Sequence, residues 1–426
     1  MKNENDNKFK IYLYYGIMFL MVLFCIEILS QLTFLIIFNK RYSAKNLRSF
    51  MVNKYDSTDQ RADFLEQEVI HPYVGYVLDF GNKKKNFTSQ GFYSNISPVV
   101  KKEEGKVNIV VLGGSVATEL PQYIEQAWKK TFKAAPRLIN LALPGFKQPQ
   151  QLMALTYFLS LGGEYDLVIN VDGFNDIVLP YVENYGAGVN LFFPRSWELR
   201  INNNLTPQVL SAMGKVKYLQ DIKRKILAEL SGSIFNISAT YGMVKMVQLI
   251  INSNEIYGNT SALFDIQKES KKKFVECGPV KHYANDTKMF EAVADFWFRC
   301  SLLINSLAKD KGFEYYHFLQ PDQYLKGSKR LNREEKRIAY NEKHIYRRPV
   351  IIGYPLLIAR GKTLVKNQVN FFDATMIFAN IGDTIYKDDC CHINNKGYQI
   401  LTDHIIEKIS RHSKFAQLKP GGALPH

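Results

Sequence analysis

The chain has 426 residues, a formal net charge of +15 and 22% charged residues. That charged fraction is too low for a disordered chain, and 46% hydrophobic residues suffice for a sizeable core in one large domain or two ordinary ones. The five cysteines follow no zinc-binding spacing, and we expect neither a metal nor a cofactor. The basic balance fits an anionic membrane surface or an acidic polymer, although scattered solvated lysines explain it as well. We expect no nucleic-acid partner.

An apolar segment near the N-terminus predicts a membrane anchor. Ile11–Phe38 carries a single charged residue, Glu27, and a helix over it would be roughly 42 Å long at about 1.5 Å per residue. This exceeds the hydrocarbon thickness, so the helix can tilt or place Glu27 near one interface. A cleaved signal peptide is the alternative, but the segment is long for one and no A-x-A-like cleavage site follows it. Lysine and arginine residues flank both ends, so charge does not decide the orientation.

Continuous apolar runs alternate with helical stretches of crossover length in the rest of the chain. Such runs are typical of strands buried on both faces of a parallel sheet. The predicted strands are Val107–Leu112, Leu138–Leu143, Leu167–Val171, Phe313–Leu319 and Val369–Asp373. This pattern predicts a three-layer α/β/α sandwich with a parallel, doubly wound, flavodoxin-like sheet.

The same pass along the chain predicts its organisation. Residues 1–38 form a cytoplasmic tail and the anchor, 39–70 a stalk, 71–412 the main domain and 413–426 a C-terminal tail. Residues 180–290 interrupt the α/β rhythm and are either a lid or a structural insertion. The basic stretch Lys326–Lys366 either holds an acidic polymer or a lipid headgroup, or is a solvated face.

Polar motifs follow three of the predicted strands, where ligands bind in open α/β sheets. Gly113-Gly114-Ser115 follows the first strand, and a helix beginning at Ser115 would aim backbone N–H groups at a developing oxyanion. A helix N-cap is the alternative role for this serine. Gly145 could add a further N–H or close a turn. Asn175, in Gly173-Phe-Asn-Asp176, could donate from its amide, or the motif could be a turn.

A serine nucleophile needs a general base, and a histidine base needs a group that holds its tautomer. Asp389-Cys-Cys-His392 offers both groups within one loop. Asp388 is a competing carboxylate, at a spacing of four from His392 rather than three. A surface acid beside a chance histidine is the simpler alternative.

Together and in this order, these motifs resemble the SGNH/GDSL hydrolase superfamily over Val107–Ile406. The resemblance implies Ser115 as nucleophile, His392 as base and Asp389 as orienting acid. It also implies an oxyanion hole made of the Ser115 and Gly145 N–H groups and the Asn175 side chain. Gly114 departs from the family pattern, in which an aspartate precedes the serine. An α/β-hydrolase is not favoured, because the G-x-S-x-G elbow is absent and the acid and histidine share one loop.

His71-Pro-Tyr-Val-Gly-Tyr76 and Phe318-Leu-Gln-Pro321 look like features of bacterial membrane-anchored members of that superfamily. Such members typically face the periplasm. We therefore expect a single-pass inner-membrane protein whose catalytic domain is periplasmic or extracellular. The expected function is a serine esterase acting on an O-acylated, mainly O-acetylated, envelope or extracellular glycan. The alternatives are a lipid acylhydrolase or acyltransferase of the same fold, and a non-catalytic scaffold in envelope assembly.

An external location also predicts a disulfide. In an oxidising compartment, at least one bridge is expected among Cys277, Cys300, Cys390 and Cys391, with a pairing that the sequence does not give. Cys390 and Cys391 lie within the proposed catalytic loop, where a covalent tie would steady its backbone.

Overall fold

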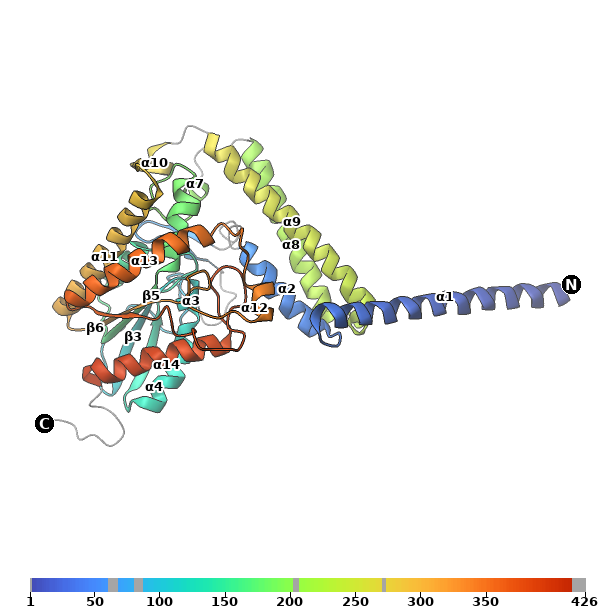
Figure 1. Ribbon diagram of the computed structural model, residues 1–426, viewed down its shortest axis with the longest axis horizontal. Coiled ribbons are helices and arrows are strands. Elements are labelled where there is room, and N and C mark those ends of the chain that lie inside the picture. The colour runs from blue at the N-terminus through green and yellow to red at the C-terminus, as the bar shows by residue number, and fades with distance from the viewer. Residues whose placement is uncertain (1, 60–67, 80–86, 202–206, 270–272, 416–426) are drawn as a thin grey trace. The chain divides into compact units, whose positions relative to one another are not determined.

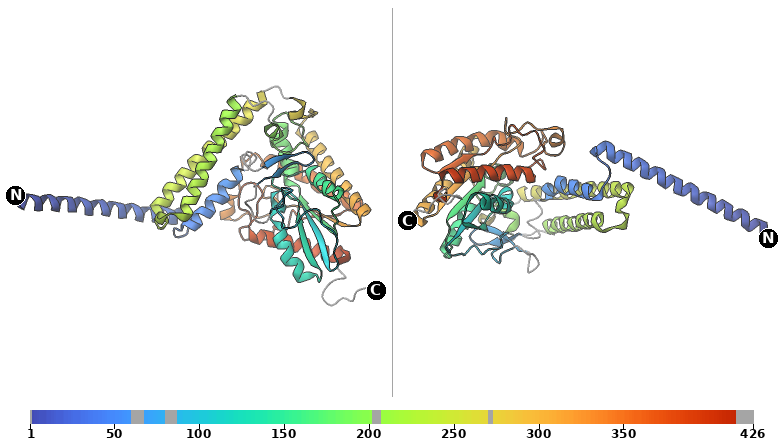
Figure 2. Two further views of the ribbon diagram at one scale, coloured as in Figure 1. Left: turned by 180° about the vertical axis from the view of Figure 1, so that it is seen from behind. Right: turned by 90° about the horizontal axis from the view of Figure 1, so that it is seen from below.

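The computed structural model describes residues 2–59, 68–79, 87–201, 207–269 and 273–415. The chain divides into two compact units. We call Met1–Ala62 with Thr206–Leu263 the anchor unit, and Asp63–Leu205 with Phe264–His426 the sheet unit. Figures 1 and 2 show the helices of the first and the α/β layers of the second.

The sheet unit is built on five parallel strands in the order β4-β3-β5-β6-β7 (Figure 1). In chain order the strands are β3 (Lys106–Gly113), β4 (Ala135–Asn140), β5 (Leu167–Asp172), β6 (Glu314–Leu319) and β7 (Asn370–Asp373). All of β5 and all of β3 except Lys106 are buried, which explains their continuous apolar sequence. The strand order is the flavodoxin-like one, so the predicted fold class is confirmed.

Helices cover both faces of this sheet. On one face α4 (Leu120–Thr131) packs against α14 (Asn395–His412), with the rings of Tyr123 and Tyr398 stacked at 5.1 Å between centroids. On the other face α11 (Asp286–Lys311) packs against α13 (Arg347–Lys366) and α5 (Gln150–Ser160). Figure 1 shows the two groups on opposite sides of the strands.

Shorter elements complete the sheet unit. They are the antiparallel pair β1 (Glu68–His71) and β2 (Gly75–Leu78), and the short helices α3 (Ser115–Thr118), α6 (Phe174–Leu179), η3 (Pro180–Tyr185), α7 (Trp197–Arg200), α10 (Phe274–Cys277) and α12 (Arg333–Ile338). Helices α3 and α6 begin within two residues of the ends of β3 and β5. Their first residues therefore lie at the carboxyl edge of the sheet.

The anchor unit is helical. It consists of α1 (Lys2–Phe38), α2 (Ala44–Asp59), α8 (Pro207–Gly232), the 3₁₀ turn η4 (Ile234–Ile237) and α9 (Ala239–Glu269). Residues 11–38 of α1 are long and apolar enough to cross a membrane. The C-terminal part of α1 joins a small apolar core with α2, α8 and α9, made by Phe34, Leu47, Met51, Ile226, Leu230 and Leu249.

Several expected boundaries differ from the structure. The stretch 39–70 contains α2 and the start of β1, while 60–67 lies outside the described residues. The stretch 180–290 divides between the units, with α8 and most of α9 in the anchor unit. Strand β4 begins and ends three residues before the predicted Leu138–Leu143, because the apolar residues after Asn140 are buried in a loop. Of the expected tail, 416–426 lies outside the described residues.

Candidate active site

Ser115 is the first residue of α3 and directly follows the end of β3 and one glycine. A tight backbone turn makes this placement possible. Gly113 has a φ of +139°, and a Cβ there would lie 2.1 Å from the Val171 carbonyl oxygen of the neighbouring strand. Only glycine fits such a position. At the start of a helix the backbone N–H of Ser115 has no partner within the helix.

His392 lies against this serine, as expected. Its Nε2 is 2.8 Å from Ser115 Oγ, although 277 residues separate the two in sequence. The histidine lies in a loop that folds back on itself. The Lys387 N–H donates to the His392 carbonyl, and Tyr386 and Ile393 form an isolated antiparallel β-bridge. The His392 side chain is 12% exposed, so the pair is sheltered but open to a ligand.

The structure corrects the expected acid: Asp388, and not Asp389, lies against His392. Asp388 Oδ2 is 2.6 Å from His392 Nδ1, and Asp388 Oδ1 accepts the N–H groups of Cys390 and His392 at 3.0 and 3.3 Å. The fold-back of the loop causes this difference, because it brings residues 388 and 392 face to face. Asp389 points elsewhere, with its carboxylate 3.8 Å from His344 Nε2.

The loop after β6 holds this turn in place. Gln323 Nε2 donates to the Asp388 carbonyl at 3.0 Å, and the Tyr324 hydroxyl donates to the Asp389 carbonyl at 2.9 Å. Both side chains are buried and follow the Phe318-Leu-Gln-Pro321 segment. No spacing rule in the sequence connects them to residues 65 positions away, so sequence reasoning missed them.

The electrostatics of the pair follow from its contacts. Burial of the His392 imidazole lowers its pKa, but the Asp388 carboxylate and its hydrogen bond outweigh burial and raise the pKa of His392 to about 9. Burial likewise raises the pKa of Asp388, and the facing imidazole and the two backbone N–H donors bring that pKa below its usual value. Asp388 is therefore a carboxylate that stabilises the protonated imidazole.

Asn175 joins the site from the start of α6. Its Nδ2 donates to the Phe146 carbonyl at 2.9 Å. The same Nδ2 lies 2.1 Å from the position that a Cβ on Gly114 would occupy. The absence of a side chain at 114, a departure from the expected family pattern, therefore makes room for this amide beside Ser115. An Asn amide has two N–H groups, and Phe146 takes one of them.

Asp176 ties the loops after β4 and β5 together. Its carboxylate accepts the Gln148 N–H at 2.7 Å and the Gly173 N–H at 3.1 Å. Burial is the main reason that the pKa of Asp176 is raised to about 8. The two loops it joins are those that carry Gly145 and Asn175. The role of Asp176 in this structure is thus to position the two segments.

Gly145 is flanked by a charged cluster that sequence reasoning missed. A Cβ on Gly145 would lie 2.4 Å from the Arg195 side chain, and Arg195 pairs with Glu68 at 2.9 Å. Arg200 pairs with the same carboxylate and stacks over the ring of Tyr76, at 3.9 Å from its centroid. These contacts fix a guanidinium beside the expected oxyanion hole. Scattered single charges in the sequence gave no signal for it.

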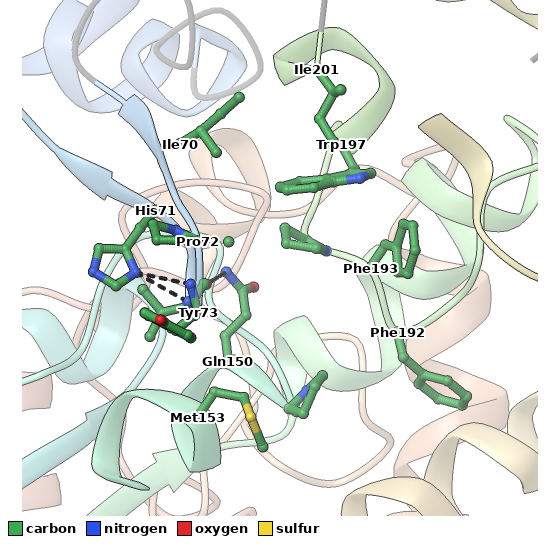
Figure 3. Close-up of a pocket in the computed structure, with 14 residues that line it drawn as sticks. Ile70, His71, Pro72, Tyr73, Gln150, Met153, Phe192, Phe193, Trp197 and Ile201 are labelled. Atoms are coloured by element: carbon green, nitrogen blue, oxygen red, sulfur yellow. Dashed lines mark hydrogen bonds between the residues drawn. The ribbon is translucent and has the colours of Figure 1, made fainter. Parts of the chain in front are cut away.

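A mainly apolar pocket of about 500 Å³ lies next to these loops (Figure 3). The turn between β1 and β2 forms one wall, and His71 Nδ1 holds it by accepting the N–H groups of Tyr73 and Val74. Aromatic residues before and within α7 line the other side: Phe192, Phe193 and Trp197. Pro149 and Gln150, which continue the loop after Gly145, line it too. The expected His71–Tyr76 motif is therefore part of a pocket wall.

All five cysteines are free thiols, which contradicts the expected disulfide. Cys390 and Cys391 are buried, with their sulfur atoms 3.6 Å apart. Among the described residues, these two thiols and His392 form a group whose ligand atoms lie within 4.8 Å of one another. A thiophilic metal could use it only by taking a His392 nitrogen from Asp388 or Ser115.

The sequence matches no protein-family model and no curated protein. Several solved structures resemble the fold weakly, among them two described as acylhydrolases. One is a proposed acylhydrolase from Bacteroides fragilis, with 10% identity over 74% of this chain and 91% of that chain and a TM-score of 0.32. The other is a lipase/acylhydrolase from Enterococcus faecalis, with 11% identity over 74% of this chain and 100% of that chain and the same TM-score. Likenesses of this strength do not define a function for this chain.

Proposed function

We propose that the chain is a serine ester hydrolase of the SGNH type whose catalytic residues are Ser115, His392 and Asp388. One observation carries this proposal: a line of contacts that is open to a ligand runs from Ser115 Oγ, at the start of α3, through both nitrogens of His392 to Asp388. A hydroxyl, a base within hydrogen-bond reach and a group that orients the base are the requirements for an activated serine. The expected role of Asp389 passes to Asp388.

In this mechanism Ser115 Oγ attacks the ester carbonyl while His392 Nε2 takes its proton. The N–H groups of Ser115 and Gly145 and the second N–H of Asn175 stabilise the oxyanion of the tetrahedral intermediate. His392 then returns the proton to the leaving alcohol, and an acyl-serine remains. Water attacks the acyl-serine with His392 again as base, which releases the carboxylic acid and restores the serine.

For the substrate we propose an O-acylated glycan, with acetyl as the preferred acyl group. The turns that carry the reactive residues contribute glycines and polar side chains, which suit a small acyl group better than a long chain. The segment 326–366 is rich in lysine and arginine, and its positive charge suits an anionic polymer.

The pocket supports a second candidate, a lipid acylhydrolase or acyltransferase. Its mainly apolar, aromatic lining, which includes Pro149 from the loop after Gly145, suits an acyl chain (Figure 3). Each methylene buried there would contribute about 0.8 kcal/mol. A membrane anchor would bring such an enzyme to lipid esters. The two candidates differ in the acyl length that the site prefers.

A fluorophosphonate probe and a series of nitrophenyl esters test both statements. Covalent labelling at Ser115, located by peptide mass spectrometry, supports the serine hydrolase. A folded protein that takes no label at Ser115 would instead support a non-catalytic scaffold. Among acetyl, butyryl and decanoyl esters, a higher kcat/KM for acetyl supports the glycan esterase, and a higher value for decanoyl supports the lipid candidate.

Two substitutions, one on α5 and one at the residue that follows its end, test the pocket separately. Met153 lines the pocket and is partly exposed, so Met153→Trp should fill it without disturbing the core. Leu161 is comparably exposed and does not line the pocket, so Leu161→Trp is the matched control. If the pocket holds an acyl chain, only Met153→Trp should lower kcat/KM for the decanoyl ester relative to acetyl.

We also propose that the sheet unit lies outside the cytoplasm of a bacterial cell, with α1 in the inner membrane. The support is the length and apolar character of residues 11–38 and the resemblance to envelope enzymes. Protease added to intact spheroplasts should remove the sheet unit. If the sheet unit is cleaved only after the cells are lysed, it lies in the cytoplasm, and the proposal is wrong.

A further inference from the structure

The second half of α1 is fixed against the turn between α8 and α9. The Glu27 carboxylate accepts hydrogen bonds from the Ser238 hydroxyl and the Ala239 N–H, both at 2.7 Å, and from the Thr240 N–H at 3.1 Å. The Thr240 hydroxyl also donates to Ser30 at 2.9 Å. A charge in the middle of an apolar helix thus has its partners at the start of α9. The turn η4 directly precedes these partners, so it lies at the level of Glu27.

This turn exposes three large apolar side chains. Ile234, Phe235 and Ile237 are 83%, 61% and 87% exposed, although the small apolar core of the same unit lies nearby. Backbone N–H groups of the turn are bonded locally, since Ser233 Oγ accepts the Phe235 N–H and the Asn236 N–H donates to the Ser233 carbonyl. The turn therefore presents apolar surface with some of its backbone N–H groups already hydrogen-bonded within the turn.

The length of the anchor indicates what covers this surface. From Ile11 to Ile26 there are sixteen residues without a charge, which span roughly 24 Å as a helix at about 1.5 Å per residue. A bilayer has a hydrocarbon core of about 30 Å and needs about 20 residues. The lysines before Ile11 mark the other end of the span. The hydrocarbon must then extend past Glu27, toward Ser30, and so reach the level of η4.

We propose that η4 inserts into the lipid bilayer that α1 crosses, with Ile234, Phe235 and Ile237 at the boundary between headgroups and acyl chains. The α8–α9 pair is then a second membrane contact of the anchor unit. These hydrogen bonds let Glu27 lie at this depth, because its carboxylate keeps the three donors from the turn and the Gln31 amide where water is scarce. The proposal rests on α1 crossing the membrane and is independent of any catalytic activity.

Tryptophan fluorescence in vesicles tests this proposal with the full-length chain. The chain is reconstituted into phosphatidylcholine and phosphatidylglycerol, with or without bromine on the acyl chains. Phe235→Trp reports on η4, and Tyr257→Trp, on an equally exposed position of α9 further from the turn, is the matched control. Phe24→Trp reports on the membrane span. Each emission is measured as the difference from the unsubstituted chain, which has three tryptophans of its own.

Brominated lipid should lower the emission of Phe235→Trp roughly two-fold, because interfacial apolar side chains reach about 5–10 Å into the headgroup and acyl boundary. Phe24→Trp should respond at least as strongly, and Tyr257→Trp should respond to aqueous iodide instead. Iodide quenching of Phe235→Trp without bromolipid quenching would overturn the proposal. Protection from both quenchers would indicate a second protein copy over η4 and would overturn it too. If brominated lipid leaves the emission of Phe24→Trp unchanged, α1 does not cross the bilayer and the proposal fails with it.

Discussion

In the described part of the sheet unit, serine, histidine and aspartate come into hydrogen-bond contact in two sets, and one of them is a candidate catalyst. In the second set, His317 Nδ1 lies 2.8 Å from Ser301 Oγ and His317 Nε2 lies 2.8 Å from Asp172. These distances match those around His392. Contact geometry between the three residue types is therefore not sufficient to identify a site.

Access and surroundings separate the two sets. Ser301 and His317 are fully buried between β6 and α11, where no substrate reaches them. Asp172 also accepts hydrogen bonds from Trp297 and Asn170, so its carboxylate is shared within the core. Ser115 is the first residue of a helix, where its backbone N–H is available to an oxyanion. Ser301 lies inside α11, and no such donor adjoins it in the described part of the chain. The buried set stabilises the end of β5, immediately before the segment that carries Asn175.

The largest expected difference between the two sets is in the serines. Ser115→Ala should abolish fluorophosphonate labelling and lower kcat by about 10⁶-fold, the size of effect seen when a catalytic serine is removed. Ser301→Ala should keep fluorophosphonate labelling and the parent kcat. Labelling is checked by intact-protein mass spectrometry, and folding by circular dichroism. Persistent labelling of Ser115→Ala would place the nucleophile elsewhere.

The next test separates neighbouring carboxylates. Asp388→Asn should lower kcat by about 10⁴-fold, because the amide no longer stabilises the imidazolium or holds the correct tautomer. Asp389→Asn, the matched control, should leave kcat within a few-fold of the parent. Equal losses in both variants would mean that the loop as a whole, and not the Asp388 contact, supports catalysis.

Asparagine side chains in the two regions should also respond differently. Asn175→Ala should lower kcat by about 10²–10³-fold with little change in KM, because an oxyanion bond strengthens in the transition state. Asn170, which donates to Asp172, is the counterpart in the buried set. Asn170→Ala should lower the melting temperature and leave kcat unchanged. If Asn175→Ala instead lowers the melting temperature and keeps the parent kcat, Asn175 serves only to shape the turn.

A pH profile sharpens the role of His392. Protonated His392 cannot take the serine proton, and its pKa is raised to about 9. The rate constant kcat/KM should therefore rise about tenfold per pH unit below that value and level off above it. In Asp388→Asn the midpoint should move down toward the ordinary histidine pKa of about 6.5. A rate that is flat between neutral pH and pH 9 would contradict this assignment.

The smallest effect concerns stability. His317→Gln should lower the free energy of unfolding by about 1–3 kcal/mol, the cost of leaving buried polar partners unsatisfied. The folded fraction should still take the fluorophosphonate label. His392→Gln should lose labelling even in its folded fraction, while its stability also falls because the buried Asp388 carboxylate loses the facing imidazole. Denaturant titration and labelling of the same samples provide both readouts.

The sequence predicted the architecture well because strands buried on both faces carry an unmistakable apolar run. It placed β4 three residues late, since the apolar, buried run continues through Leu143 beyond the end of the strand at Asn140. Leu141 and Leu143 still donate backbone N–H bonds to β3. It also predicted the meeting of Ser115 and His392, because the carboxyl ends of parallel strands share one edge.

The acid could not be chosen in this way. Asp388 and Asp389 are chemically identical neighbours, and only the backbone fold-back of 387–392 decides which of them faces His392. The Arg195–Glu68 pair was equally hidden, because 127 residues separate its members and neither belongs to a motif. Such long-range pairings are set by tertiary packing, which leaves no local trace in a sequence.

The separation of Ser115 from His392 has a consequence for biosynthesis. Domains tend to fold as units while a chain emerges from the ribosome, N-terminal parts first. The strand and glycine turn that present Ser115 are made early, but the base arrives 277 residues later, close to the C-terminal end. A nascent or truncated chain therefore carries an inert hydroxyl. If Ser115 and His392 act as proposed, reactivity toward acyl groups begins only after the loop that carries His392 has been made.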